Sequence, residues 1–237
     1  MYNREDLFIN DQSCINIGLY PAELPGISVP ARQYNETTIP GRDGIFYEDL
    51  ETFDDINQSV KFNFRARKGQ TVDTSFRQYR RFLRNAKTYA KQSDPTVFYK
   101  IKKVTIGDLS RGTSFTIGTF DCEFVLAPYA YLQTGAVEYP IQKVVNNPFD
   151  VCHPIYILKG NGSCNLIING KSMKCNVSGK LFIDTELRLA YRSNGEWVNS
   201  SVSGNYEDLY LQSGLNSIKV TNSSILLRVI PNWRYEP

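Results

Sequence analysis

The chain has 237 residues, of which 41% are hydrophobic and 22% charged, and its formal net charge is +3. This composition supports a buried core and excludes a disordered chain, and the small net charge gives no evidence for a nucleic-acid partner. No run approaches the ~20 apolar residues that a membrane-spanning helix requires, so we expect no contact with a membrane.

The five cysteines are odd in number and contain no Cys-x-x-Cys pair. Residues 1–10 carry charges of both signs and lead into no apolar run, so we expect no signal peptide and free thiols in a reducing compartment. Three of the cysteines, Cys152, Cys164 and Cys175, lie within reach of His153 in the sequence, but their spacing fits no standard zinc pattern. We therefore expect neither a metal nor a cofactor.

The first distinctive element is the stretch PGRDG, residues 40–44. It has neither the spacing of a phosphate loop nor the Arg-Gly-Asp order of an integrin ligand. Pro40 fixes its own φ, and Gly41 and Gly44 supply positive φ at little cost. The stretch predicts the tip of a hairpin.

A strand is predicted at residues 60–66, where apolar and polar side chains alternate. Residues 71–95 change to a helical period, with Asp73 as the expected N-cap and Asp94-Pro95 as the stop. The apolar stripe of this helix consists of Phe76, Tyr79, Leu83, Ala86 and Ala90.

Strands resume at residues 96–104 and 114–126, and a change in apolar parity predicts a β-bulge or a bend at Gly118-Thr119. Residues 133–148 have the composition of a linker, so we expect domains at 1–138 and 139–237. The second half contains short apolar runs at the spacing of an antiparallel β-sandwich, with hairpin signals at Asn169-Gly170 and Asn194-Gly195. The predicted strands there are residues 155–159, 165–169, 172–177, 180–184, 187–191, 196–198, 206–211, 216–221 and 225–230.

No catalytic constellation stands out. His153 has no orienting acid nearby in the sequence, and we interpret it as a packed or surface side chain. Asp184 and Glu186 have a spacing that a glycosidase pair can adopt, but their place at a hairpin corner favours turn formation. Trp197 and Trp233 are either sugar-stacking platforms or packing residues. We expect that the protein is not an enzyme.

The charges are segregated along the chain. Residues 36–55 hold seven acids against Arg42, whereas residues 61–91 hold ten bases against Asp73. A basic helix face is usually solvated, but unrelieved repulsion favours a counter-charge from the acidic block of the same chain or of a second copy. The resulting candidates for subunit contact are Arg42, Asp43, Asp54, Asp55, Arg77, Arg80, Arg81 and Arg84.

Three stretches together carry a resemblance to a known family. They are PGRDGIFYEDLETFDDINQSVKFNFRA (residues 40–66), FTIGTFDCEFVLAPYAY (residues 115–131) and NPFDVCHPIYILKGNGSCNLIINGK (residues 147–171). In this order the chain resembles the distal tail proteins of siphophages, the long-tailed, non-contractile phages, that infect Gram-positive bacteria. The resemblance covers nearly the whole sequence.

The resemblance implies a mainly β protein. Its N-terminal domain is expected to be a β-barrel-like or split-barrel sheet with one amphipathic helix and a projecting hairpin, and its C-terminal domain a galectin-like antiparallel β-sandwich. It further implies a structural role without catalytic residues, in a homo-hexameric ring at the tail tip that joins the tail tube to the baseplate or tail-tip fibre.

The implied partners are other copies of the chain and other tail proteins, namely the tail tube, a hub protein and receptor-binding or baseplate proteins. Genome DNA is expected to pass through the ring without sequence-specific binding. Assembly is expected in the bacterial cytoplasm and final residence in the virion. The alternative is a carbohydrate-binding adhesin that acts through the C-terminal sandwich.

Overall fold

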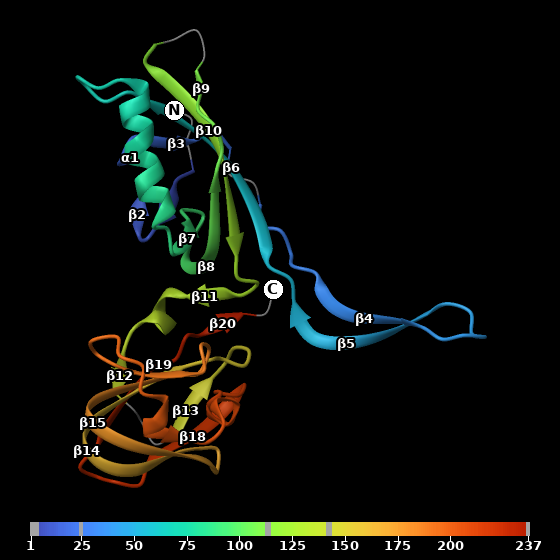
Figure 1. Ribbon diagram of the computed structural model, residues 1–237, viewed down its shortest axis with the longest axis vertical. Helices are drawn as coiled ribbons and strands as arrows, with labels where there is room; N and C mark the ends of the chain where they lie inside the picture. Colours follow the sequence, from blue (N-terminus) through green and yellow to red (C-terminus); the bar gives the residue numbers. More distant parts are fainter. Residues whose placement is uncertain (1–4, 24–25, 112–114, 141–143, 236–237) are drawn as a thin grey trace. The chain divides into compact units, whose positions relative to one another are not determined.

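A computed structural model describes residues 5–23, 26–111, 115–140 and 144–235 (Figure 1). The protein is mainly β, as expected. Contacts divide it into two compact units, the first ending at Ala130 and the second beginning at Tyr131, and each has its own hydrophobic core. The expected domains, 1–138 and 139–237, stay a prediction, because compactness alone does not define an independently folding unit.

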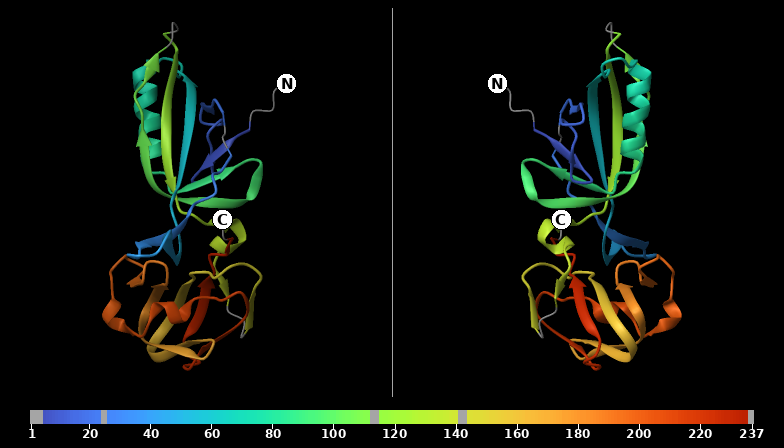
Figure 2. Two further views of the ribbon diagram at one scale, coloured as in Figure 1. Left: turned by 90° about the vertical axis from the view of Figure 1, so that its right-hand side faces the viewer. Right: turned by 90° about the vertical axis from the view of Figure 1, so that its left-hand side faces the viewer.

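The first unit is built on an antiparallel sheet with the order β2-β1-β7-β8-β10-β6-β3, and β9 pairs with β10. Figures 1 and 2 show the single α-helix of this unit lying along one face of the sheet. The strands are β1 (Leu7–Ile9), β2 (Gln12–Ser13), β3 (Leu19–Pro21), β6 (Ile56–Arg65), β7 (Thr88–Lys91), β8 (Asp94–Ile106), β9 (Ser110–Arg111) and β10 (Ile117–Leu126).

The predicted β-bulge at Gly118-Thr119 is wrong. The register of β10 against β6 is continuous from Ile117 to Leu126, and the irregularity lies at the far end, against β8. The parity of the apolar residues changes because Phe115 is 96% exposed and Ile117 47% exposed, so neither belongs to the core. Gly118 has a packing role instead, since a Cβ there would lie 2.5 Å from the Phe64 ring.

The helix, α1 (Val72–Arg84), begins before the predicted N-cap and ends well before the predicted stop. Its N-cap is Thr71 and not Asp73, because the Thr71 hydroxyl accepts a hydrogen bond from the Thr74 N–H at 3.2 Å. It ends at Asn85, well before Asp94, and the predicted stripe residue Ala90 lies on strand β7.

The helix stops early because the following residues find better partners in the sheet. The Lys87 and Thr88 N–H groups donate to the Asn10 side chain at 2.7 and 3.2 Å. Strand β7 then pairs with β1 on one side and β8 on the other. Since Thr88 and Tyr89 are β-branched and aromatic, tertiary pairing easily overrides their weak helical preference.

The predicted apolar stripe of α1 does pack on the sheet. The Phe76 ring lies 5.0 Å from that of Phe120, and the Tyr79 ring lies 5.1 Å from that of Phe64. The Tyr79 hydroxyl also donates to the backbone oxygen of Ile17 at 3.1 Å. These contacts hold the opposite, basic face of the helix toward solvent.

Strands β4 (Arg32–Thr38) and β5 (Ile45–Phe53) form a separate two-stranded hairpin, called the arm (residues 32–53) from here on. Figure 1 shows it running away from the sheet of the first unit. At its tip the Arg42 N–H donates to the Ile39 oxygen at 3.1 Å, and Gly41 and Gly44 have φ of 81° and 85°. The predicted hairpin tip is confirmed.

The second unit is also antiparallel. Its strands are β12 (Tyr139–Pro140), β13 (Val144–Asn147), β14 (Ile155–Ile168), β15 (Lys171–Asp184), β16 (Leu189–Arg192), β17 (Val202–Ser203), β18 (Gly214–Val220) and β19 (Leu226–Ile230). Strand β11 (Ala130–Leu132) begins at the last residue of the first unit and pairs with β20 (Arg234–Tyr235). Short 3₁₀ turns span Gln133–Ala136, Asn199–Ser201 and Tyr206–Leu209. The last of these replaces the strand predicted at residues 206–211.

One long hairpin, β14–β15, organises this unit. Four of the predicted short strands are in fact its two 14-residue strands. One half pairs with β19 and β16, and the other half with β18 and β17. Because the inward side chains of both halves belong to one core, the halves form two layers that face each other across it.

The turn chemistry of the second unit is partly as predicted. Asn169 and Gly170 both have positive φ, at 49° and 86°, which confirms the two-residue hairpin. At Asn194-Gly195 only the glycine does, and the Gly195 N–H donates to the Arg192 oxygen in a longer loop.

Candidate interaction surfaces

The arm exposes apolar side chains on both of its faces. Six large ones are between 39% and 55% exposed, namely Tyr34, Ile39, Ile45, Phe46, Tyr47 and Leu50. The strands pair Glu36 with Tyr47 and Thr37 with Phe46, so the Tyr47 and Phe46 rings lie on opposite faces. A two-stranded hairpin is marginally stable in water by itself, and a contiguous exposed apolar surface marks an interaction site.

Sequence reasoning missed these side chains as contact residues. A signal was present, because Ile45, Phe46 and Tyr47 are consecutive apolar residues on a strand, and consecutive positions cannot all face one core.

The predicted acidic residues lie on the arm and at its base. Arg42 and Asp43 are exposed at the tip, and neither forms an ion pair within the described residues. At the base Asp54 accepts a hydrogen bond from the Gln33 side chain at 2.6 Å, and Asp55 pairs with Lys102.

One arm carboxylate is held locally. The Asp49 carboxylate accepts hydrogen bonds from the Glu51 N–H at 2.8 Å and the Arg32 Nε at 2.9 Å. These two donors lower the pKa of Asp49, the backbone N–H contributing most. The local ion pair accounts for one acid, and the arm keeps an exposed negative excess.

The predicted basic residues lie along the outer side of α1. Arg77, Arg81 and Arg84 are exposed, and the Arg80 guanidinium lies over the Phe76 ring, 5.6 Å from its centroid. Among the described residues, none of the four forms an ion pair. The hypothesis of pairing with the acidic block inside one chain therefore finds no support, and pairing between copies stays a prediction.

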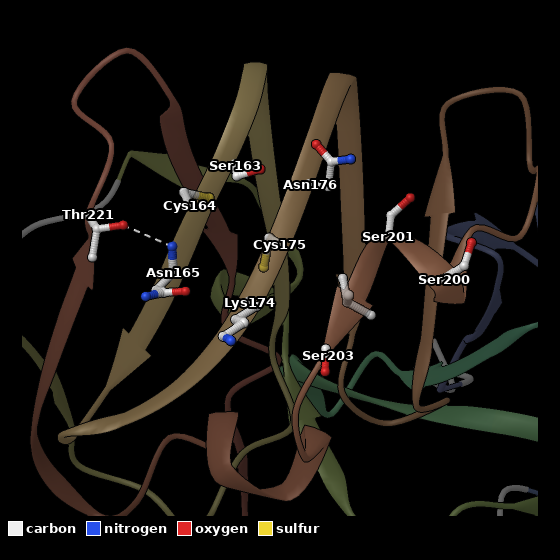
Figure 3. Close-up of a pocket in the computed structure, with 11 residues that line it drawn as sticks. Ser163, Cys164, Asn165, Lys174, Cys175, Asn176, Ser200, Ser201, Ser203 and Thr221 are labelled. Carbon is white, nitrogen blue, oxygen red and sulfur yellow. Dashed lines mark hydrogen bonds between the residues drawn. The ribbon is translucent and has the colours of Figure 1, made fainter.

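The second unit carries a polar groove of about 430 Å³ on the outer face of one layer (Figure 3). Four strands contribute a row of outward side chains across it: Thr221, Asn165, Lys174 and Ser203. The Asn165 N–H donates to the Thr221 hydroxyl at 2.9 Å. Lys174 is the one charged group among the lining residues.

Aromatic side chains gather on the other layer. The half-buried Phe182 and Tyr191 rings stack with centroids 5.1 Å apart, and Trp197, opposite Tyr191 in an isolated bridge, is 75% exposed. Trp233 is instead half-buried against Phe149. Hydroxyl-rich and aromatic surfaces are thus separated, whereas a sugar site normally combines them.

The residues considered for catalysis have packing roles. The Asp184 carboxylate accepts hydrogen bonds from the Glu186 and Leu187 N–H groups at 3.0 and 2.9 Å, which confirms it as a turn former. The His153 ring stacks on that of Tyr210, with centroids 4.0 Å apart.

The described ranges contain no group of three or more metal-ligating side chains that could hold an ion. They also contain no helix of the length and apolarity needed to cross a bilayer.

Comparison with protein-family models and with curated proteins finds no match for this sequence. Among solved structures, the chain is similar to the crystal structure of SPP1 Dit, described as a paradigm of the hub adsorption apparatus in phages that infect Gram-positive bacteria. The two share 15% identity, with a TM-score of 0.59, and the match covers 95% of this chain and 98% of the other. The fold expected from the resemblance to distal tail proteins is thereby confirmed over nearly the whole chain.

Proposed function

We propose that the protein is a structural component of a phage tail tip that assembles with itself through the arm. The observation that carries this proposal is the arm itself, with six half-exposed apolar side chains and no strand partner outside the hairpin in the described part of the chain. The apolar side chains of an unpartnered arm stay in contact with water, and a neighbouring molecule that covers them contributes the free energy of burying that surface.

The charges supply a reason for the partner to be a second copy. The exposed acids of the arm and the exposed arginines of α1 belong to one chain, but among the described residues they form no ion pairs with each other. A contact in which the arm of one copy meets the helix of the next uses two different surfaces, so it is a head-to-tail contact. Such contacts close into a ring when the rotation per copy allows it, and a homo-hexamer is the ring that the family resemblance implies.

The remaining parts of the proposal follow from that role. The ring would join the tail tube to a baseplate or tail-tip fibre, and genome DNA would pass through its lumen without base-specific contacts. The second unit would offer its outer surfaces to other tail proteins, including receptor-binding proteins. The protein would be assembled in the host cytoplasm and reside in the virion. The likeness to SPP1 Dit supports a scaffold of this kind and no enzyme.

The second candidate function is carbohydrate binding by the second unit. The hydroxyl- and amide-lined groove favours it, since these groups hydrogen-bond sugar hydroxyls. The absence of an aromatic platform among the lining residues weighs against it. A glycan array probed with the full chain tests this alternative, and sugar binding that a Lys174→Ala and Asn165→Ala variant loses would establish it.

Charge reversal on the helix tests the main proposal. We expect Arg77→Glu combined with Arg84→Glu to abolish self-association, measured by light scattering of purified protein. The control reverses two exposed lysines of the second unit, Lys159→Glu with Lys219→Glu, and should leave association unchanged. Unchanged association of the helix variant would refute the arm-to-helix contact.

A further inference from the structure

Two cysteines of the second unit lie directly opposite each other. Cys164 on β14 and Cys175 on β15 are register partners, and both side chains point into the same core. Opposed residues in an antiparallel pair have Cα atoms about 4.5–5.5 Å apart, within the range of about 4.4–6.8 Å that disulfides use. The Cys175 thiol donates a hydrogen bond to the Met173 backbone oxygen at 3.6 Å.

Two of the other three cysteines lie opposite residues of other types. Cys122 lies opposite Val60 on one side and Ile106 on the other, and Cys152 lies opposite Leu211. The Cys152 thiol donates to the Asp150 oxygen at 3.0 Å. Among the described strand pairs, Cys164 and Cys175 are thus the one pair of cysteines that lie opposite each other.

The opposed pair lies next to the polar groove. Cys164 and Cys175 are 6% and 3% exposed, and both contribute to the lining of the polar groove (Figure 3). Figure 3 shows Cys164 and Cys175 on neighbouring strands, among the polar side chains that line the groove. By comparison, Cys122 is 0% exposed.

We propose that Cys164 and Cys175 form a cross-strand disulfide when the protein meets an oxidising disulfide such as oxidised glutathione. One thiolate attacks the small disulfide, which releases one reduced thiol and leaves a mixed disulfide. The second cysteine thiolate then attacks the first cysteine's sulfur, which breaks the mixed disulfide and releases the second reduced thiol. Two S–H bonds are lost and one S–S bond is gained, and both electrons and both protons end on the two released thiols.

The surroundings of the two thiols determine how fast the disulfide forms. Burial raises the pKa of both thiols, that of Cys175 to about 12, so the thiolate fraction is small and the reaction slow. The pair therefore stays reduced during assembly in a reducing cytoplasm and oxidises slowly afterwards. This timing rests on the proposed virion role, but the cross-link itself does not.

The test treats the full-length folded chain with oxidised glutathione, blocks the remaining thiols with an alkylating reagent in denaturant, and maps the peptides by mass spectrometry. We expect the loss of two reactive thiols, a cross-linked 164–175 peptide, and reversal by dithiothreitol. Cys175→Ser should abolish the cross-link, whereas the control Cys152→Ser should retain it.

Five reactive thiols in the folded protein, under conditions that oxidise the urea-unfolded chain, would overturn the proposal. Cross-links scattered over Cys14, Cys122 and Cys152 would overturn it equally. Because the readout needs no assembly, the disulfide and the ring can fail or succeed independently.

Discussion

Removing the exposed rings of the arm should weaken self-association without weakening the fold. Tyr47 and Phe46 are 55% and 47% exposed. A fully buried aromatic side chain removes about 150–250 Å² of surface from water, so each of these two side chains still has about 100 Å² of surface in contact with water. At about 25 cal/mol per Å², covering one such surface contributes about 2.5 kcal/mol. The variant Phe46→Ser with Tyr47→Ser should therefore cost about 2–5 kcal/mol for each contact, according to whether one or both rings are covered.

This loss corresponds to a rise in Kd of roughly 30-fold to several thousand-fold. Analytical ultracentrifugation over a range of concentrations measures it directly. Because both rings are half in water already, thermal unfolding of the variant monomer should match wild type within the small effect of a surface substitution. The control Leu187→Ser removes a side chain that is 63% exposed on a turn of the second unit, and should leave Kd unchanged. Equal association of the arm variant and wild type would refute the reasoning.

Three predictions concern stability, each measured by urea or thermal unfolding. Tyr156→Phe should cost about 1–3 kcal/mol, since the buried hydroxyl donates to the Leu209 oxygen at 2.8 Å and that acceptor would be left unsatisfied; no loss would mean that water replaces the donor. Gly118→Ala should cost about 1–3 kcal/mol, because the new Cβ meets the Phe64 ring, and an unchanged midpoint would show that the ring moves freely. Burial raises the pKa of Cys122 from 9.0 to about 12, so its contribution to the free energy of unfolding is present below pH 9 and is lost as the pH rises toward 12. The variant Cys122→Ala should therefore show a smaller loss of stability over this pH range. An identical loss in the variant and wild type would mean that other groups cause it.

Sequence reasoning worked best where local chemistry decides the structure. The two-residue turn at Asn169-Gly170 and the arm tip at Gly41 and Gly44 are predictable because they require positive φ, which few residue types tolerate. The buried stripe of Phe76, Tyr79 and Leu83 follows from the helical period, which a long amphipathic segment makes unambiguous.

Errors arose where distant partners decide. The helix was extended to Asp94 because Ala86 and Ala90 continued its period, but pairing of β7 with two strands ended it sooner. The long hairpin β14–β15 was divided into four strands because Gly160 and Gly179 look like turn residues. Both glycines have positive φ inside paired strands. The sequence pattern alone does not distinguish such a glycine from one in a turn.

The candidate surfaces were only partly visible in the sequence. The segregation of arm acids from helix arginines was apparent, but Arg80 is engaged with Phe76 and Asp55 with Lys102, so these two are weaker contact candidates than their exposed neighbours. The apolar surface of the arm was missed because an exposed hydrophobic side chain is recognised only once the core is known.

Electron microscopy of the purified full chain in negative stain tests the central claim most directly. The account predicts closed ring particles whose class averages have six-fold symmetry, and it predicts that these disappear in the Phe46→Ser and Tyr47→Ser variant. Wild-type protein that remains monomeric at its highest soluble concentration, or rings that persist unchanged in the arm variant, would contradict it.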